Sequence, residues 1–255
     1  MEYTHLSKTV NIKTISETSK SGVFEIEGLF AGYGLTVGNA IRRALLSSLP
    51  GAAVTQVKVK NVAHEFSVLP GVKEDIVELT MNFKKLKFRM HTDEPKVLLL
   101  KTKGEKVVTG GDVKPDSDVE IVNPDAVLAT LTAKNAELEI EITVERGLGY
   151  SAVESRKGEK LAIGVIAIDA YFSPVLKVNY TAQNMRVGER TDYDRLRLEI
   201  ETDGTISPSS ALHKAAVILR DHFDKVVAVE VREFETKEVS AEEGTKKKSR
   251  AKKQA

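Results

Sequence analysis

The segment from residue 28 to residue 51, GLFAGYGLTVGNAIRRALLSSLPG, constrains the fold most, because it joins a glycine-rich turn to a helix with two committed faces. Thr36 is a suitable N-cap and Pro50-Gly51 can end the run, so we expect a helix over residues 37–49. Its core-facing stripe is mainly apolar and comprises Val37, Ile41, Ala44, Leu45 and Ser48.

The other side of this expected helix carries Asn39, Arg43 and Leu46. An apolar side chain one turn from an arginine resembles the centre of a protein interface, where arginine and large apolar residues gather. Two interpretations stay open at this point. The face contacts another protein, or it is an ordinary solvated surface.

Most of the remaining chain alternates between apolar and polar residues, which predicts half-buried strands. The clearest case is ELEIEITVER, with apolar side chains on one face and mainly acidic ones on the other. The expected strands cover residues 8–14, 23–29, 54–62, 86–90, 96–102, 137–146, 161–170, 174–187 and 195–202. A short helix is expected near residues 75–84. Mostly antiparallel strands with two principal helices predict an α+β fold.

The second principal helix is expected to begin at Ser207-Pro208, an N-cap followed by a proline at the first helical position, and to reach about residue 228. Its apolar stripe is broad and comprises Leu212, Ala215, Ala216, Leu219, Phe223 and Val226. A helix with this much apolar surface is either sunk within its own domain or packs both on a sheet and on a helix of another subunit.

Composition narrows the classes of protein that remain. The 255 residues include no cysteine, which excludes disulfides and thiolate zinc sites and fits a reducing cytoplasm. No apolar run approaches the roughly 20 residues that span a bilayer, and the N-terminal residues do not have the layout of a signal peptide. We therefore expect a cytoplasmic protein without membrane contact.

The charge distribution is uneven along the chain. The net charge is +1, but the last ten residues, KKKSRAKKQA, carry six basic side chains, so the rest of the chain has a net charge of −5. Such a tail can make salt-sensitive contacts with phosphate, or it can be a disordered solubilising end. We expect residues 236–255 to be a disordered basic tail.

Two motifs resemble ligand sites without completing one. Gly32, Gly34 and Gly38 form G-x-G-x-x-x-G, one residue off the dinucleotide-binding fingerprint, and close packing of the helix explains Gly38 more simply. His64-Glu65 resembles the start of a zinc-protease motif, but Val68 stands where the second histidine belongs.

The remaining candidates for chemistry are equally incomplete. Asp192 and Asp194 form a pair of carboxylates that can chelate magnesium, yet they lie in a polar connection where acidic residues are common. Ser151 follows Gly149, but Val153 breaks the nucleophile-elbow pattern. We therefore predict no catalytic residue, no cofactor and no metal ion in this chain.

Five segments, in this order, resemble the bacterial RNA polymerase alpha subunit family over residues 5–232. They are GLFAGYGLTVGNAIRRALLSSLPG (28–51), HEFSVLPGVKEDIVEL (64–79), VERGLGY (144–150), IDAYFSPVLKVNY (168–180) and ERTDYDRLRLEIETDGTISPSSAL (189–212). The resemblance implies a dimerisation subdomain, residues 1–49 plus 171–235, in which two long helices pack on an antiparallel sheet. Residues 50–170 would form an inserted, mostly β subdomain for assembly.

The resemblance also implies a homodimer built around the two long helices. The residues expected at its interface are Ile41, Leu45, Leu212, Leu219 and Phe223. Arg43 and Leu46, with Asn39 beside them, correspond to the family's contact with the beta subunit, and Lys84 and Ile168 to its contact with beta-prime. Other interpretations are a solvated edge for Lys84, which lies in a lysine run, and a core position for Ile168.

The function that the resemblance implies is that of a non-catalytic subunit of DNA-dependent RNA polymerase. It would be a scaffold that initiates assembly of beta and beta-prime and meets DNA indirectly, through the complex. The family usually continues into a small helical C-terminal domain, and we expect this chain, which ends at Ala255, to represent the N-terminal part alone. The alternative is a nucleic-acid-binding module that acts through Lys246 to Lys253.

Overall fold

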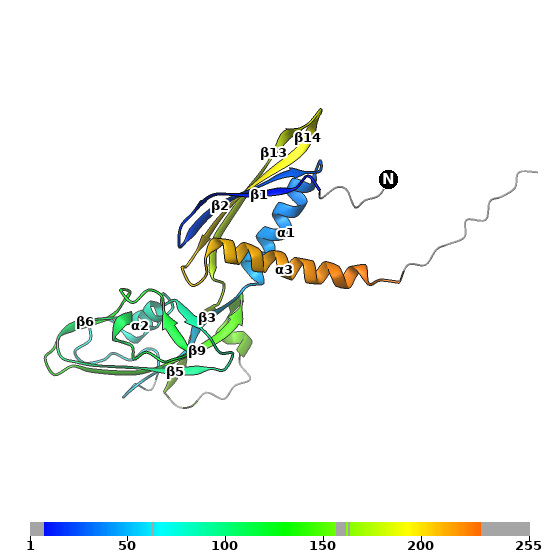
Figure 1. Cartoon of the computed structure of the whole chain (residues 1–255). Coiled ribbons are helices and arrows are strands. Elements are labelled where there is room, and N and C mark those ends of the chain that lie inside the picture. The colour runs from blue at the N-terminus through cyan, green and yellow to red at the C-terminus, as the bar shows by residue number, and fades with distance from the viewer. Residues whose placement is uncertain (1–7, 63, 157–161, 163, 231–255) are drawn as a thin grey trace, which may run out of the picture.

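The computed structural model describes residues 8–230 apart from 63, 157–161 and 163. Two lobes are visible, joined where the chain passes between them (Figure 1). The basic tail at 236–255, with the alternative site at Lys246 to Lys253, lies outside the described residues. We name the lobe of residues 50–172 the insert lobe, and the lobe of residues 8–49 and 173–230 the helix lobe.

The helix lobe is a four-stranded antiparallel sheet that carries two long helices. In spatial order its strands are β1 (Asn11–Glu17), β2 (Ser21–Leu29), β14 (Arg190–Thr202) and β13 (Val175–Val187). Alternation explains β14, in which Leu196, Leu198 and Ile200 are buried while the residues between them face solvent. Helices α1 (Tyr33–Ser47) and α3 (Pro208–Val227) pack on this sheet and on each other, and the C-terminal half of α3 extends beyond it (Figure 1).

Helix α1 begins earlier than the sequence predicts. Its N-cap is Gly32, in the left-handed conformation with φ 83°, and not Thr36. The Gly34 amide donates to Asp194 Oδ2 at 2.9 Å, so a carboxylate from β14 satisfies a free amide of the first turn. The predicted start is wrong because the capping group lies 160 residues away in the chain.

The other two helices lie where the sequence predicts them, and α3 begins at its predicted cap. Ser207 caps α3 by accepting a hydrogen bond from the Ser210 amide, with Pro208 in the first turn. Helix α2 (Ile76–Phe83) is capped by Asp75, whose Oδ1 accepts from the Glu78 amide at 2.7 Å. The α+β fold class, with mostly antiparallel strands and two long helices, is confirmed.

The insert lobe is built on a six-stranded sheet. Five of its strands lie in the order β5 (Lys96–Lys103), β9 (Glu137–Leu148), β3 (Pro50–Val59), β4 (Phe88–Met90) and β7 (Val119–Ile121), and β11 (Val165–Ala167) also pairs with β3. Two small sheets pair β6 (Lys106–Thr109) with β8 (Val127–Leu131), and β10 (Tyr150–Ser151) with β12 (Ala170–Tyr171). Residues Gly110–Asp112 and Val153–Arg156 form short 3-10 helices.

Each lobe has its own apolar core. One cluster of buried side chains comes from residues between 54 and 168, and another from residues 24–49 and 175–215. A third, small cluster of Ala53, Ala170 and Phe172 lies where the chain passes between the lobes. The two main cores are therefore separate.

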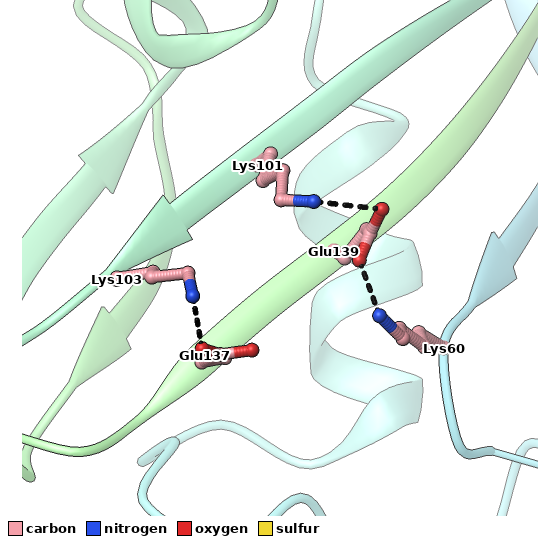
Figure 2. Close-up of polar contacts among 5 residues, drawn as sticks. All are labelled: Lys60, Lys101, Lys103, Glu137 and Glu139. Atoms are coloured by element: carbon pink, nitrogen blue, oxygen red, sulfur yellow. Dashed lines mark hydrogen bonds and ion pairs between the residues drawn. The ribbon is translucent and has the colours of Figure 1, made fainter.

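Ion pairs cover the outer face of β9 and its neighbours (Figure 2). Glu139 lies between Lys60 Nζ at 2.7 Å and Lys101 Nζ at 3.3 Å, and Glu137 pairs with Lys103. Hydrogen bonds from Lys60 and Lys101 lower the pKa of the Glu139 carboxyl. Opposite charges across neighbouring strands favour the observed register, although solvent keeps each pair weak.

Candidate protein-interaction surfaces

The outer face of α1 is exposed and cationic. Gly34, Gly38, Ile41, Ala44 and Leu45 are buried on the side that meets the sheet and α3. At about 100° per residue, the opposite side holds Asn39, Arg43 and Leu46, of which the first two are exposed and Leu46 is half-buried.

No carboxylate among the described residues lies within ion-pair distance of the Arg43 guanidinium. Its donors are therefore open to a partner, and a guanidinium can hold a carboxylate or two carbonyls through two parallel hydrogen bonds. Leu46 packs on the helix-lobe core while keeping part of its side chain in contact with solvent. Within the described part of the chain, the face therefore combines a cation that has no carboxylate partner with an apolar side chain, as interface centres do.

Lys84 is part of a small network that the sequence analysis did not predict. Its Nζ lies 3.5 Å from Asp169 Oδ2, while Asp169 Oδ1 accepts a hydrogen bond from the Val153 amide at 3.0 Å. The Tyr150 hydroxyl acts on the same carboxyl, whose pKa it lowers. The backbone bond from Val153, then the Tyr150 hydroxyl and the charge of Lys84, hold the pKa of the Asp169 carboxyl below its ordinary value.

Ile168 lies beside this network but has almost no free surface. Its side chain is 4% exposed and belongs to the insert-lobe core. Its carbonyl accepts a hydrogen bond from Arg156, whose guanidinium also reaches the carbonyl of Thr55 at 3.5 Å. The Ile168 side chain is therefore part of the core and anchors this stretch of backbone. The side chain that reaches solvent belongs to its neighbour Asp169.

An exposed segment runs between the two surfaces. Leu148 pairs with Pro50, which follows the end of α1, and Gly149 lies close to the Ser47 carbonyl. Tyr150, 61% exposed, then reaches Asp169. The α1 face and the Lys84 network are therefore joined by residues 148–150. No role was predicted for these residues, although Gly147 and Gly149, which end the apolar alternation of β9, were a usable signal.

The residues predicted for a dimer interface divide into two groups. Ile41 and Leu212 are buried and Leu45 is fully buried, so their side chains have little or no surface left for a second copy. Leu219 is half-buried, and Phe223 is 61% exposed. Val226 and Val227 continue this exposed apolar stripe towards the end of α3.

The remaining motifs have local structural roles. A Cβ on Gly38 would come within 2.7 Å of the Tyr180 ring, which confirms that this glycine permits close packing. Asp192 binds Arg190 through both oxygens, and Asp194 caps α1. Within the described part of the chain, no three histidine or acidic side chains are placed to hold a metal ion. None of the helices there is long and apolar enough to cross a membrane.

A family model and several known proteins similar to this chain point to the same family. Residues 57–173 match the family model described as RNA polymerase Rpb3/RpoA insert domain. DNA-directed RNA polymerase subunit alpha of Symbiobacterium thermophilum is 50% identical over 215 residues, which cover 84% of this chain and 68% of the relative. The same subunit of Moorella thermoacetica is 51% identical over 203 residues, which cover 80% of this chain and 64% of the relative.

The subunit alpha of Alkaliphilus oremlandii is 47% identical over 220 residues, which cover 86% of this chain and 69% of that protein. The alignments therefore take in most of this chain and about two thirds of each relative's length. At this identity and coverage, the chain belongs to the family of bacterial DNA-directed RNA polymerase alpha subunits.

Proposed function

We propose that this chain forms a homodimeric scaffold on which the beta and beta-prime subunits of an RNA polymerase assemble. The observation that carries the proposal is the outer face of α1, where Arg43 has no ion-pair partner within the described chain and lies opposite the buried face. We assign this face, with Asn39 and Leu46, to the beta subunit. A rigid helix packed on a sheet holds these side chains in place before the partner arrives.

The C-terminal half of α3 supports the homodimer. Leu219, Phe223 and Val227 recur at helical spacing on a part of α3 that extends beyond its own sheet (Figure 1). An apolar stripe of this kind is stable in water when a second surface covers it. A second copy provides such a surface through two-fold symmetry. We accordingly propose that the helix lobe is the dimerisation subdomain.

We assign the second contact, to beta-prime, to the Lys84 network on the insert lobe. Here Lys84 and Tyr150 are exposed and Asp169 is half-buried between them, with Ile168 in the core below. Both copies of a symmetric dimer present both surfaces, so the assembly itself must decide which copy holds which large subunit.

The proposed role is structural within a nucleotidyltransferase complex, with catalysis and direct contact with DNA left to other subunits. The relatives are named as subunits of DNA-directed RNA polymerase. The compartment that follows from this role is the cytoplasm.

Co-purification with the beta subunit tests the proposal. We expect the unchanged chain to capture beta from its own source and Arg43→Ala to lose it. Arg42→Ala is the matched control, because it removes the same charge from the flank of the same exposed helix. Light scattering and thermal unfolding show whether each variant is still a folded dimer.

The outcomes separate the parts of the proposal. Capture by the unchanged chain and by Arg42→Ala, but not by Arg43→Ala, supports both the scaffold and the assigned face. If the unchanged chain captures no beta, the scaffold is wrong. If Arg43→Ala captures as well as the unchanged chain, the beta contact lies elsewhere.

A further inference from the structure

The two lobes meet without a shared apolar core. The chain passes between them at two places, residues 49–51 and 172–174, which we call the neck. The neck is tight, because a Cβ on Gly51 would lie 1.9 Å from the Phe172 carbonyl oxygen and one on Gly147 would lie 2.7 Å from the Phe172 ring. Tight packing at the neck restricts movement there. Rotation of one lobe relative to the other about the neck has to be limited by contacts elsewhere.

Beside the neck the lobes are separated by a cavity of about 260 Å³. Its lining comes from both sides and includes Met90 and Arg146 of the insert lobe and Ile206 and Lys214 of the helix lobe. This space is partly open to solvent, so the lobes do not pack against each other here and apolar contacts do not fix their angle at this place.

Arg89 crosses this gap. It lies on β4 of the insert lobe, and its Nε donates to the Thr205 carbonyl at 3.1 Å while Nη2 donates to the Gly204 carbonyl at 3.4 Å. Its Nη1 binds Glu120 on the neighbouring strand β7 at 2.8 Å, which orients the guanidinium. Away from the neck, the side-chain hydrogen bonds that join the lobes in the described part of the chain come from Arg89.

The two carbonyls belong to a well-held loop immediately before α3. Asp203 accepts from both the amide and the hydroxyl of Thr205, at 2.9 Å and 2.6 Å, and Gly204 has φ 94°. Ser207, two residues later, caps α3. Fixing this loop to β4 therefore fixes the start of α3 relative to the insert lobe.

We propose that Arg89 is a positioning residue that latches the insert lobe to the loop before α3 and so sets the angle between the two lobes. The rigid planar fork of a guanidinium serves two carbonyls and one carboxylate from three separate nitrogens, whereas the three donors of a lysine ammonium all lie on one nitrogen and do not span these acceptors in the same geometry. The consequence for assembly rests on the proposed function: the latch holds the α1 face and the Lys84 network in the relative placement that one large-subunit assembly needs.

Distance measurements between the lobes test the latch without any large subunit. The chain has no native cysteine, so spin labels at Glu105→Cys and Asn179→Cys, exposed sites on the insert and helix lobes, report the angle alone. Labelled chain is mixed with an excess of unlabelled chain, so that a dimer carries at most one labelled copy. We expect one narrow distance distribution, which broadens and shifts in Arg89→Ala and broadens less in Arg89→Lys.

Arg146→Ala is the matched control. Arg146 lines the same cavity and its ion pair, with Asp93 at 2.7 Å, stays within the insert lobe. Thermal unfolding identifies any variant that fails to fold. If Arg89→Ala does not fold, Arg89→Lys still tests the latch. The latch is wrong if both Arg89 variants give the distribution of the unchanged chain, or if Arg146→Ala broadens it as much as Arg89→Ala.

Capture of beta and beta-prime by the same variants tests separately whether the latch matters for assembly of the large subunits. Broadened distances with a reduced yield of complex support both. Broadened distances with an unchanged yield leave the latch standing and contradict its role in assembly. If the unchanged chain captures neither large subunit, the proposed function fails while the distances still decide the latch.

Discussion

Arg43 and Lys84 are exposed cations on the two candidate surfaces, yet their surroundings differ. Arg43 has no carboxylate partner among the described residues, whereas Lys84 already lies 3.5 Å from Asp169. A partner's carboxylate gains a new ion pair at Arg43 but has to share Lys84 with an existing one. Exposure alone therefore does not predict how much a residue contributes to binding, because the hydrogen-bonding capacity that its side chain still has unused also matters.

The contrast between Arg43 and Lys84 does not hold if binding of beta depends on how helix α1 packs and not on the Arg43 side chain. Leu45, fully buried beneath the α1 face, tests this. We expect Leu45→Ala to lower the free energy of unfolding by about 2–5 kcal/mol, because it removes buried methyl groups and leaves a cavity. Arg43→Ala should leave the free energy of unfolding within about 0.5 kcal/mol of the original.

Urea unfolding monitored by circular dichroism measures both values. At temperatures where Leu45→Ala is still folded, it should bind beta with nearly unchanged affinity. A large loss of stability in Arg43→Ala would show that Arg43 acts through the fold, and the comparison would then have no meaning.

Replacing each cation by the other basic residue separates the effect of its charge from that of its hydrogen-bonding geometry. Arg43→Lys keeps the charge but loses the two-donor fork, so we expect affinity for beta to fall by about tenfold, or about 1.4 kcal/mol. Lys84→Arg keeps the charge beside Asp169 and should change affinity for beta-prime by less than about threefold, or about 0.7 kcal/mol. Titration of each variant dimer with the separate large subunits measures both. Equal losses would mean that the two cations bind in the same way.

Removing the Lys84 side chain gives a smaller effect than removing that of Arg43. We expect Lys84→Ala to weaken binding of beta-prime by about 0.5–1 kcal/mol, because the existing pair with Asp169 and exposure to solvent both reduce what the cation contributes. Lys85→Ala, in the same lysine run, is the control, because Lys85 is exposed and its Nζ binds Asn82. The loss should diminish as salt rises. A loss that equals that of Arg43→Ala would contradict the ranking.

How much of this the sequence predicts depends on how local each signal is. Ser207-Pro208 and Asp75 cap their helices from within four residues, and both helices were predicted. The start of α1 was missed because Asp194 caps it from another strand. Five short strands, β6, β7, β8, β10 and β12, were missed because two to five residues are too few to show a period.

The candidate surfaces divide in the same way. Helical spacing alone places Arg43 opposite the buried face of α1, and the structure has it there. The network around Lys84 joins residues 84, 150, 153 and 169, which come from four separate parts of the chain. No local pattern connects them, so the resemblance pointed to Ile168, and Asp169 beside it, whose side chain reaches solvent, was overlooked.

The smallest expected effect concerns Asp169 and pH. Because the hydrogen bond from the Val153 amide, the Tyr150 hydroxyl and the charge of Lys84 hold its folded-state pKa below the ordinary 3.8, ionised Asp169 stabilises the folded chain above pH 3.8. This contribution is lost as pH falls from 3.8 through the folded-state pKa. We expect Asp169→Asn to lower the free energy of unfolding at neutral pH by less than about 1 kcal/mol, since the side chain is partly exposed and solvent screens its charge.

The difference between Asp169→Asn and the unchanged chain should therefore shrink towards zero as urea unfolding is repeated at decreasing pH. Asp125→Asn is the control, because Asp125 is exposed and forms no ion pair in the described chain. A difference that stays constant with pH would show that Asp169 contributes through its shape and hydrogen bonds and not through its charge. Lys84 would then be a free cation like Arg43, and the distinction between the two surfaces would be lost.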